Sequence, residues 1–167
     1  MTDPDDVSTG CVLGPLRFAG FVPRMRILPR ANNVLTLVRG DPYGQVDSVT
    51  TWGKNWSFLR RLIGLQAPRD IAIDDEHMEL LVLDSRGVLA FPLAAEGAAT
   101  SLRQLQVPAD ARRLLLDKKR DQIDVLTPTG IFSYARTASG AASPLGLLRG
   151  PRSGLQQAVA FALCSTL

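Results

Sequence analysis

Few side chains in this sequence have the types and spacing that acid–base, nucleophilic or metal chemistry requires. The only histidine is His77, and it follows the acidic residues Asp74, Asp75 and Glu76. A metal site built from several histidines is therefore excluded by count. The sequence contains no Gly-x-Ser-x-Gly elbow, no P-loop and no dinucleotide-binding fingerprint. We expect His77 to be a solvent-facing turn residue and Asp74 to cap a turn with its carboxylate.

The two cysteines give no further chemistry. Cys11 and Cys164 stand near opposite ends of the chain and form no CxxC pair and no metal-ligand spacing. Two reduced cysteines are expected in preference to a disulfide. Paired carboxylates can act as acid and base without histidine, but no residue pattern supports such a pair here. We predict no catalytic residue, no metal site and no cofactor, and enzymatic activity is the less favoured alternative.

The elements that position these side chains are short apolar runs separated by turn-like segments. Between Leu65 and Gln106 there are four such runs, each of strand length and too short to indicate a helix. They are 71–73, 79–84, 88–92 and 101–105. Gly87, between the second and third runs, predicts a tight hairpin that needs a positive φ. Four antiparallel strands in about 40 residues correspond to one blade of a β-propeller.

The same pattern recurs downstream. Residues 114–117 align with 71–74, and Gly130 aligns with Gly87, both at a shift of 43 residues. Upstream, 34–38 align with 79–83, and Pro23-Arg24 aligns with Pro68-Arg69, both at a shift of 45 residues. A period of about 40–45 residues with four strands per unit is typical of propeller blades. We therefore predict an all-β fold, a β-propeller of four-stranded antiparallel blades.

The predicted organisation is a flexible tail over 1–13 and a partial propeller over 14–167. Three complete blades cover about 21–64, 65–106 and 107–154, with an orphan outer strand at 14–20 and an orphan inner strand at 157–163. A ring typically needs about 4–8 blades, so three do not close one. A second copy of the chain, another propeller chain, or the rest of a longer gene product would complete it, and self-association is the favoured solution.

The second blade opens with Leu-Gln-Ala-Pro-Arg-Asp-Ile-Ala-Ile-Asp over 65–74. This phrase resembles the opening of NHL-type repeats in bacterial β-propeller proteins. Phrases around Tyr134-Ala135-Arg136, Ala138-Ser139-Gly140 and Ser143-Pro144-Leu145 are similar to those of related bacterial propellers. The resemblance covers roughly 14–162 and concerns the fold far more than the function. Because some NHL-type propellers bind RNA on a basic face, the resemblance implies that RNA binding is a possible function here. Lyases built on similar propellers use several histidines with a metal.

Each predicted blade is entered by a segment that carries arginine. We call this set the entry arginines: Arg24, Arg26, Arg69, Arg112 and Arg113. The same charge at similar blade positions would form a positive ring around the central opening, where RNA or another anionic ligand would bind by contacts to phosphate. The formal net charge of +3 is a mild bias that demands no such partner. Solvation of the rim is the favoured explanation.

These observations favour a non-enzymatic binding or scaffold module that acts through protein–protein interaction. The first alternative is RNA or anion binding by the entry arginines. The second alternative is that the chain is a fragment of a propeller lyase or hydrolase. Trp52 and Trp56 are expected to pack between blades. The acidic N-terminus lacks the features of a signal peptide, and no apolar run approaches the roughly 20 residues of a membrane helix. We expect a soluble, cytoplasmic protein, or an exported one if a leader has been trimmed.

Overall fold

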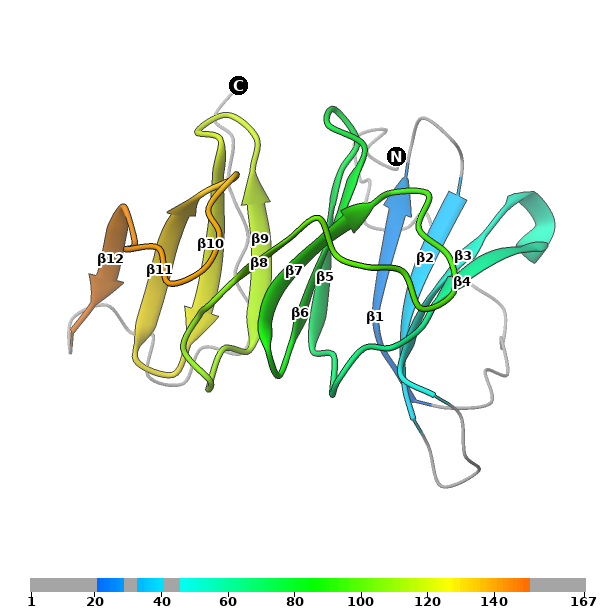
Figure 1. Ribbon diagram of the computed structural model, residues 1–167, viewed down its shortest axis with the longest axis horizontal. Helices are drawn as coiled ribbons and strands as arrows, with labels where there is room; N and C mark the ends of the chain where they lie inside the picture. Colours follow the sequence, from blue (N-terminus) through cyan, green and yellow to red (C-terminus); the bar gives the residue numbers. More distant parts are fainter. Residues whose placement is uncertain (1–20, 29–32, 41–45, 151–167) are drawn as a thin grey trace, which may run out of the picture.

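The computed structural model describes residues 21–28, 33–40 and 46–150. These residues form three four-stranded antiparallel sheets in which the strands pair in chain order (Figure 1). The first blade contains β1 (Phe21–Leu28), β2 (Asn33–Arg39), β3 (Ser48–Trp52) and β4 (Phe58–Leu62). The second contains β5 (Asp70–Asp74), β6 (Glu79–Asp84), β7 (Gly87–Pro92) and β8 (Arg103–Leu105). The third contains β9 (Arg113–Asp117), β10 (Gln122–Thr127), β11 (Gly130–Ala135) and β12 (Gly146–Arg149).

The predicted fold class is confirmed. The described part of the chain is almost entirely β, with one short 3-10 turn at Lys54–Trp56 between β3 and β4. The four strands predicted between 65 and 106 are present, and β6 has the predicted bounds. The three sheets lie side by side in a row of propeller-like blades, and the described residues do not close a ring (Figure 1). The predicted tail, both orphan strands and both cysteines lie outside the described residues.

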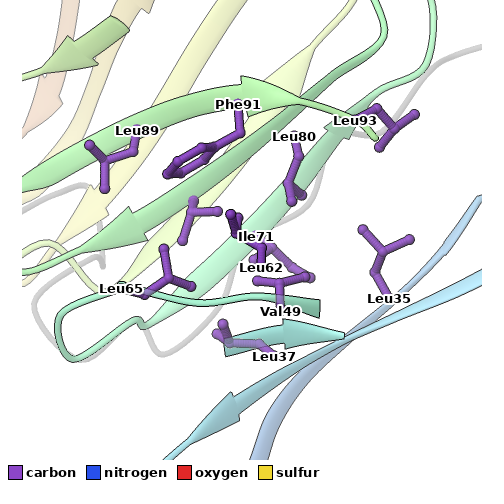
Figure 2. Close-up of a cluster of buried hydrophobic side chains, with 11 residues drawn as sticks. Leu35, Leu37, Val49, Leu62, Leu65, Ile71, Leu80, Leu89, Phe91 and Leu93 are labelled. Carbon is purple, nitrogen blue, oxygen red and sulfur yellow. The ribbon is translucent and has the colours of Figure 1, made fainter. Parts of the chain in front are cut away.

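The second blade is buried on both faces, because it lies between the first and third blades and its strands direct apolar side chains alternately to both sides. One face packs against the first blade, as Figure 2 shows, and the other face packs against the third blade. The cluster between the first and second blades includes Leu35, Leu37, Val49 and Leu62 facing Ile71, Leu80, Val82, Leu89 and Phe91. The cluster between the second and third includes Leu81, Leu83, Val88, Ala90 and Leu105 facing Leu114, Ile123, Val125 and Tyr134.

The predicted 45-residue alignment of the first and second blades is wrong by one residue. Leu35 and Leu37 face the following blade, as Leu81 and Leu83 do, so the two strands correspond at a shift of 46. A slip of one residue moves every side chain to the opposite face of the sheet. Hydropathy could not fix this register, because β6 is apolar on both faces and fits either alignment.

Each blade is joined to the next by what we call a glycine bridge. Gly97, in the loop before β8, donates its N–H to Arg61 O at 2.8 Å and accepts from Ile63 N at 2.9 Å. An equivalent pair of hydrogen bonds, 43 residues further on, joins Gly140 to Gln104 and Gln106. Gly97 and Gly140 have φ of 62° and 61°, a left-handed conformation that favours glycine. The outer strand of one blade is therefore fixed by a loop of the next.

The positive φ predicted at Gly87 is confirmed. Its φ is 126°, and a Cβ at this position would collide with the carbonyl oxygen of Leu105. Gly130 has the same relation to Leu148 O, 43 residues further on. The hairpin and the close approach of the outer strand both require glycine.

Candidate functional site

Arg26 is engaged within the fold. Its Nη2 lies 3.2 Å from Oδ1 of the buried Asp70. The other carboxylate oxygen of Asp70 accepts a hydrogen bond from Leu114 N at 3.0 Å. Asp70 therefore connects β1, β5 and β9, the inner strands of all three blades. This contact gives Arg26 a structural role.

Arg69 also holds neighbouring blades together. Its Nη1 donates to Ala109 O and to Ala111 O, each at 2.7 Å, in the segment that enters the third blade. A guanidinium that satisfies two carbonyl oxygens is held in one orientation. Arg69 is thus directed at the protein's own backbone.

The other entry arginines are less constrained by the described contacts. Arg112 is exposed, and Arg113 is half-buried and donates its Nη1 to Arg112 O at 2.8 Å. Arg24 pairs with Leu37 through its position on β1, and its side chain lies outside the described residues. The geometry therefore places Arg26 and Arg69 in contacts between blades, and ligand binding by the entry arginines stays a prediction.

Asp74 caps the turn after β5, as predicted. Its Oδ1 accepts a hydrogen bond from His77 N at 3.1 Å, and its Oδ2 lies 2.9 Å from His77 Nδ1. Asp117 repeats the cap 43 residues later, where its Oδ1 accepts from Arg120 N at 3.0 Å. His77 is exposed at the turn, which confirms its predicted position.

An ion-pair network near this turn joins the second and third blades. Arg103 binds Glu79 through both guanidinium nitrogens at 2.6 Å, and this hydrogen bonding holds the pKa of Glu79 below its ordinary value of 4.5. Arg136, from the third blade, lies 3.5 Å from Glu79 and 3.6 Å from Asp74, and its Nε donates to Asp121 at 2.6 Å. No local sequence pattern indicates this network, because Arg136 is 57 residues from Glu79 and farther still from Asp74.

This arrangement is suited to holding blades together. Asp74, Glu79 and Asp121 each contact an arginine. Over the ranges that the structure describes, no group of three or more His, Cys, Asp or Glu side chains could hold a metal ion. The same ranges contain no helix long and apolar enough to cross a membrane.

Trp52 lies on the face of the first blade that points away from the second. Its Nε1 donates to Thr36 Oγ1 at 2.8 Å, and its ring meets Phe58 edge-on at a centroid distance of 6.2 Å. The guanidinium of Arg61 lies over the Phe58 ring at 5.9 Å. Trp52 therefore corresponds to Phe91 in the second blade, which packs against the blade before it.

The outer strand of the third blade differs most from its counterparts. Leu62 and Leu105, on β4 and β8, are each 1% exposed, whereas Leu148 on β12 is 57% exposed. All four residues of β12 are exposed. In the first and second blades the glycine bridge covers this strand. Within the described residues, no loop glycine binds the corresponding backbone groups of β12, which are Leu147 O and Arg149 N.

The repeat itself distinguishes this exposure from ordinary surface leucines. Leu102 in the second blade is 59% exposed, and its counterpart Leu145 is 63% exposed. That position is open to solvent even where another blade follows, so exposure at Leu145 is usual. Leu148 occupies a position that is buried wherever another blade follows. Sequence reasoning indicated that three blades leave blade faces unpaired, but it did not single out Leu148, because Leu105 and Leu148 are the same residue type in the same pattern.

Comparison with models of known protein families and with curated protein sequences finds no match to the chain.

Proposed function

We propose that the chain is a non-enzymatic protein-binding module whose third blade receives a β-structure from a partner protein. The observation that supports it is the contrast between Leu105, 1% exposed, and Leu148, 57% exposed, at the same position of consecutive blades.

The strand β12 has the properties of a receiving edge. It is the outermost strand of its sheet, and its backbone groups on the open side are available for pairing. Leu147 and Leu148 add apolar surface beside them. Burial of one leucine side chain stabilises a complex by about 1.5–3 kcal/mol before the costs of association. A partner that covers this strand therefore gains both hydrogen bonds and apolar contact.

RNA or anion binding is less well supported, because two of the entry arginines are directed into the fold. Arg26 contacts Asp70, and Arg69 contacts backbone carbonyl oxygens of the next blade. Arg112, Arg113 and Arg24, which the described contacts constrain less, are the remaining support for that alternative. No contact among the described residues favours a lyase or hydrolase.

Site-specific photocrosslinking tests the proposal. A benzoylphenylalanine is placed at Leu148, and in separate variants at Leu145 and Leu102, and cells that produce each variant are irradiated. We expect a discrete adduct from position 148 that is destroyed by protease and resists nuclease. Equal yields at all three positions, or no adduct at 148, would show that the proposal is wrong. A nuclease-sensitive adduct would favour the RNA alternative.

A further inference from the structure

This inference rests on the proposed function and names its partner. We propose that the third blade is covered by the first blade of a second copy of this chain, so that the copies associate head to tail. The two copies contact each other through different surfaces, with β12 of one against the loop between β3 and β4 of the other. The contact between the two molecules would repeat the interface that joins the second and third blades within one molecule.

The geometry of the existing interfaces defines what a following blade must present. Each following blade places the loop before its outer strand against the outer strand of the preceding blade, and that loop contains a left-handed residue. In the second and third blades this residue is Gly97 and Gly140. A blade that covers β12 must offer the same element to Leu147 O and Arg149 N.

The first blade presents a left-handed residue in the corresponding loop. Asn55, between β3 and β4, has φ 58° and ψ 27°, close to the φ of 62° at Gly97. Asparagine is among the few residues with a side chain that adopt this conformation readily. Asn55 is exposed, so its backbone is accessible to a second molecule.

Exposed apolar side chains lie on one face of the first blade, in a row across the sheet that ends beside this loop. Phe58 and Ile27 are each 56% exposed, and both lie on the face of the first blade that carries Trp52. In the second blade the corresponding face is buried against the blade before it. The first and third blades lie at opposite ends of the row, so the described residues of one molecule do not bring these two surfaces together (Figure 1). Two molecules can, and unlike surfaces of this kind form rings or filaments.

Two single-surface variants test the arrangement by light scattering after size exclusion over a dilution series. Leu148→Arg blocks the third-blade surface, and Phe58→Glu blocks the first-blade surface. The wild-type chain of 18.1 kDa is expected to form a dimer or a longer head-to-tail oligomer. Each variant alone is expected to dissociate at least tenfold more readily. Leu145→Arg is the matched control, and it should associate as the wild type does.

Mixing the variants gives the decisive result. A mixture of Leu148→Arg and Phe58→Glu retains one intact pair of surfaces, so it is expected to form a dimer that neither variant forms alone. A monomeric wild type, an unaffected Phe58→Glu variant, or no recovery on mixing would overturn the proposal. Circular dichroism confirms folding, and Leu148→Ser or Ile27→Glu replaces a variant that does not fold.

The two experiments together distinguish a wrong proposed function from a wrong partner. A monomeric wild type together with a crosslink from position 148 to another protein would refute the second copy and preserve protein binding. A monomeric wild type without any crosslink from position 148 would refute both.

Discussion

Substitution of Asp70 is the most direct test of how the inner strands β1, β5 and β9 are held together. The Asp70 carboxylate accepts hydrogen bonds from Arg26 Nη2 at 3.2 Å and Leu114 N at 3.0 Å, and so connects the first and third blades through the second. The Asp70→Ala substitution removes both acceptors. It leaves the Leu114 N–H in a buried position and releases a guanidinium that is already partly exposed.

Three hydrogen bonds are lost, because Asp70 Oδ1 also accepts from Ile71 N at 3.0 Å, and they differ in size. A buried N–H without an acceptor costs about 1–3 kcal/mol. The pairing with Arg26 contributes less, about 1 kcal/mol or below, because the Arg26 side chain is 38% exposed and water can replace its partner. We expect Asp70→Ala to lower the free energy of unfolding by about 2–4 kcal/mol. Asp70→Asn keeps one carbonyl oxygen for Leu114 N, so its effect should be about half as large.

Urea denaturation followed by circular dichroism measures these values, with Arg26→Ala as the comparison. Arg26→Ala is expected to cost about 1 kcal/mol or less. The reasoning is refuted if Asp70→Ala costs under about 1 kcal/mol, or if Arg26→Ala costs as much as Asp70→Ala. In the second case, the ion pair and not the hydrogen bond to β9 would hold the strands.

Three further predictions follow from the other contacts. Gly87→Ala should destabilise the fold by about 3 kcal/mol or more in thermal unfolding, because its Cβ would collide with Leu105 O on β8. Gly97→Ala has open space for a Cβ and should cost only about 1–2 kcal/mol. Equal effects of the two substitutions would contradict the close approach of β8 to Gly87. The pKa of Glu79 is lowered in the folded state, so the stability that its carboxylate contributes is complete above the ordinary pKa of 4.5 and is lost as the pH falls through the lower pKa of the folded state. The difference in unfolding free energy between wild type and Glu79→Gln should therefore narrow on acidification from pH 7 to about 3. A constant difference would contradict the lowered pKa. If the entry arginines bind RNA, fluorescence anisotropy with a short single-stranded RNA should show salt-sensitive binding that is lost in the triple alanine variant; unchanged binding would exclude this site. The triple variant replaces Arg24, Arg69 and Arg112.

The strands could be predicted from the sequence because each carries its own local signal. The runs at 71–73 and 79–84 are bounded by turn residues, and the glycine at 87 indicates a hairpin. The 43-residue period between the second and third blades was visible because both have loops of the same length. The first blade has a different hairpin and a shorter loop before its outer strand, so its register could not be read from spacing alone.

The contacts of the candidate sites could not be predicted in the same way. The arginine at 69 and the charged pair at 103 and 79 depend on partners that are far away in the chain. A sequence shows that a side chain is charged but does not show which backbone carbonyl or carboxylate will be close to it. The different exposure of Leu105 and Leu148 likewise depends on whether another blade follows, which no local pattern records.

The glycine bridges also impose an order on folding during synthesis. The outer strand of the first blade ends at Leu62, but the glycine that fixes it stands at position 97, 35 residues later. At about 5–20 residues per second, a ribosome needs roughly 2–7 s to add that segment. Each blade therefore passes through a period in which three strands are paired and the fourth lacks its final contact. For β12 the final contact would come from a separate molecule, and the length of this period would then depend on the concentration of the partner and not on the speed of translation.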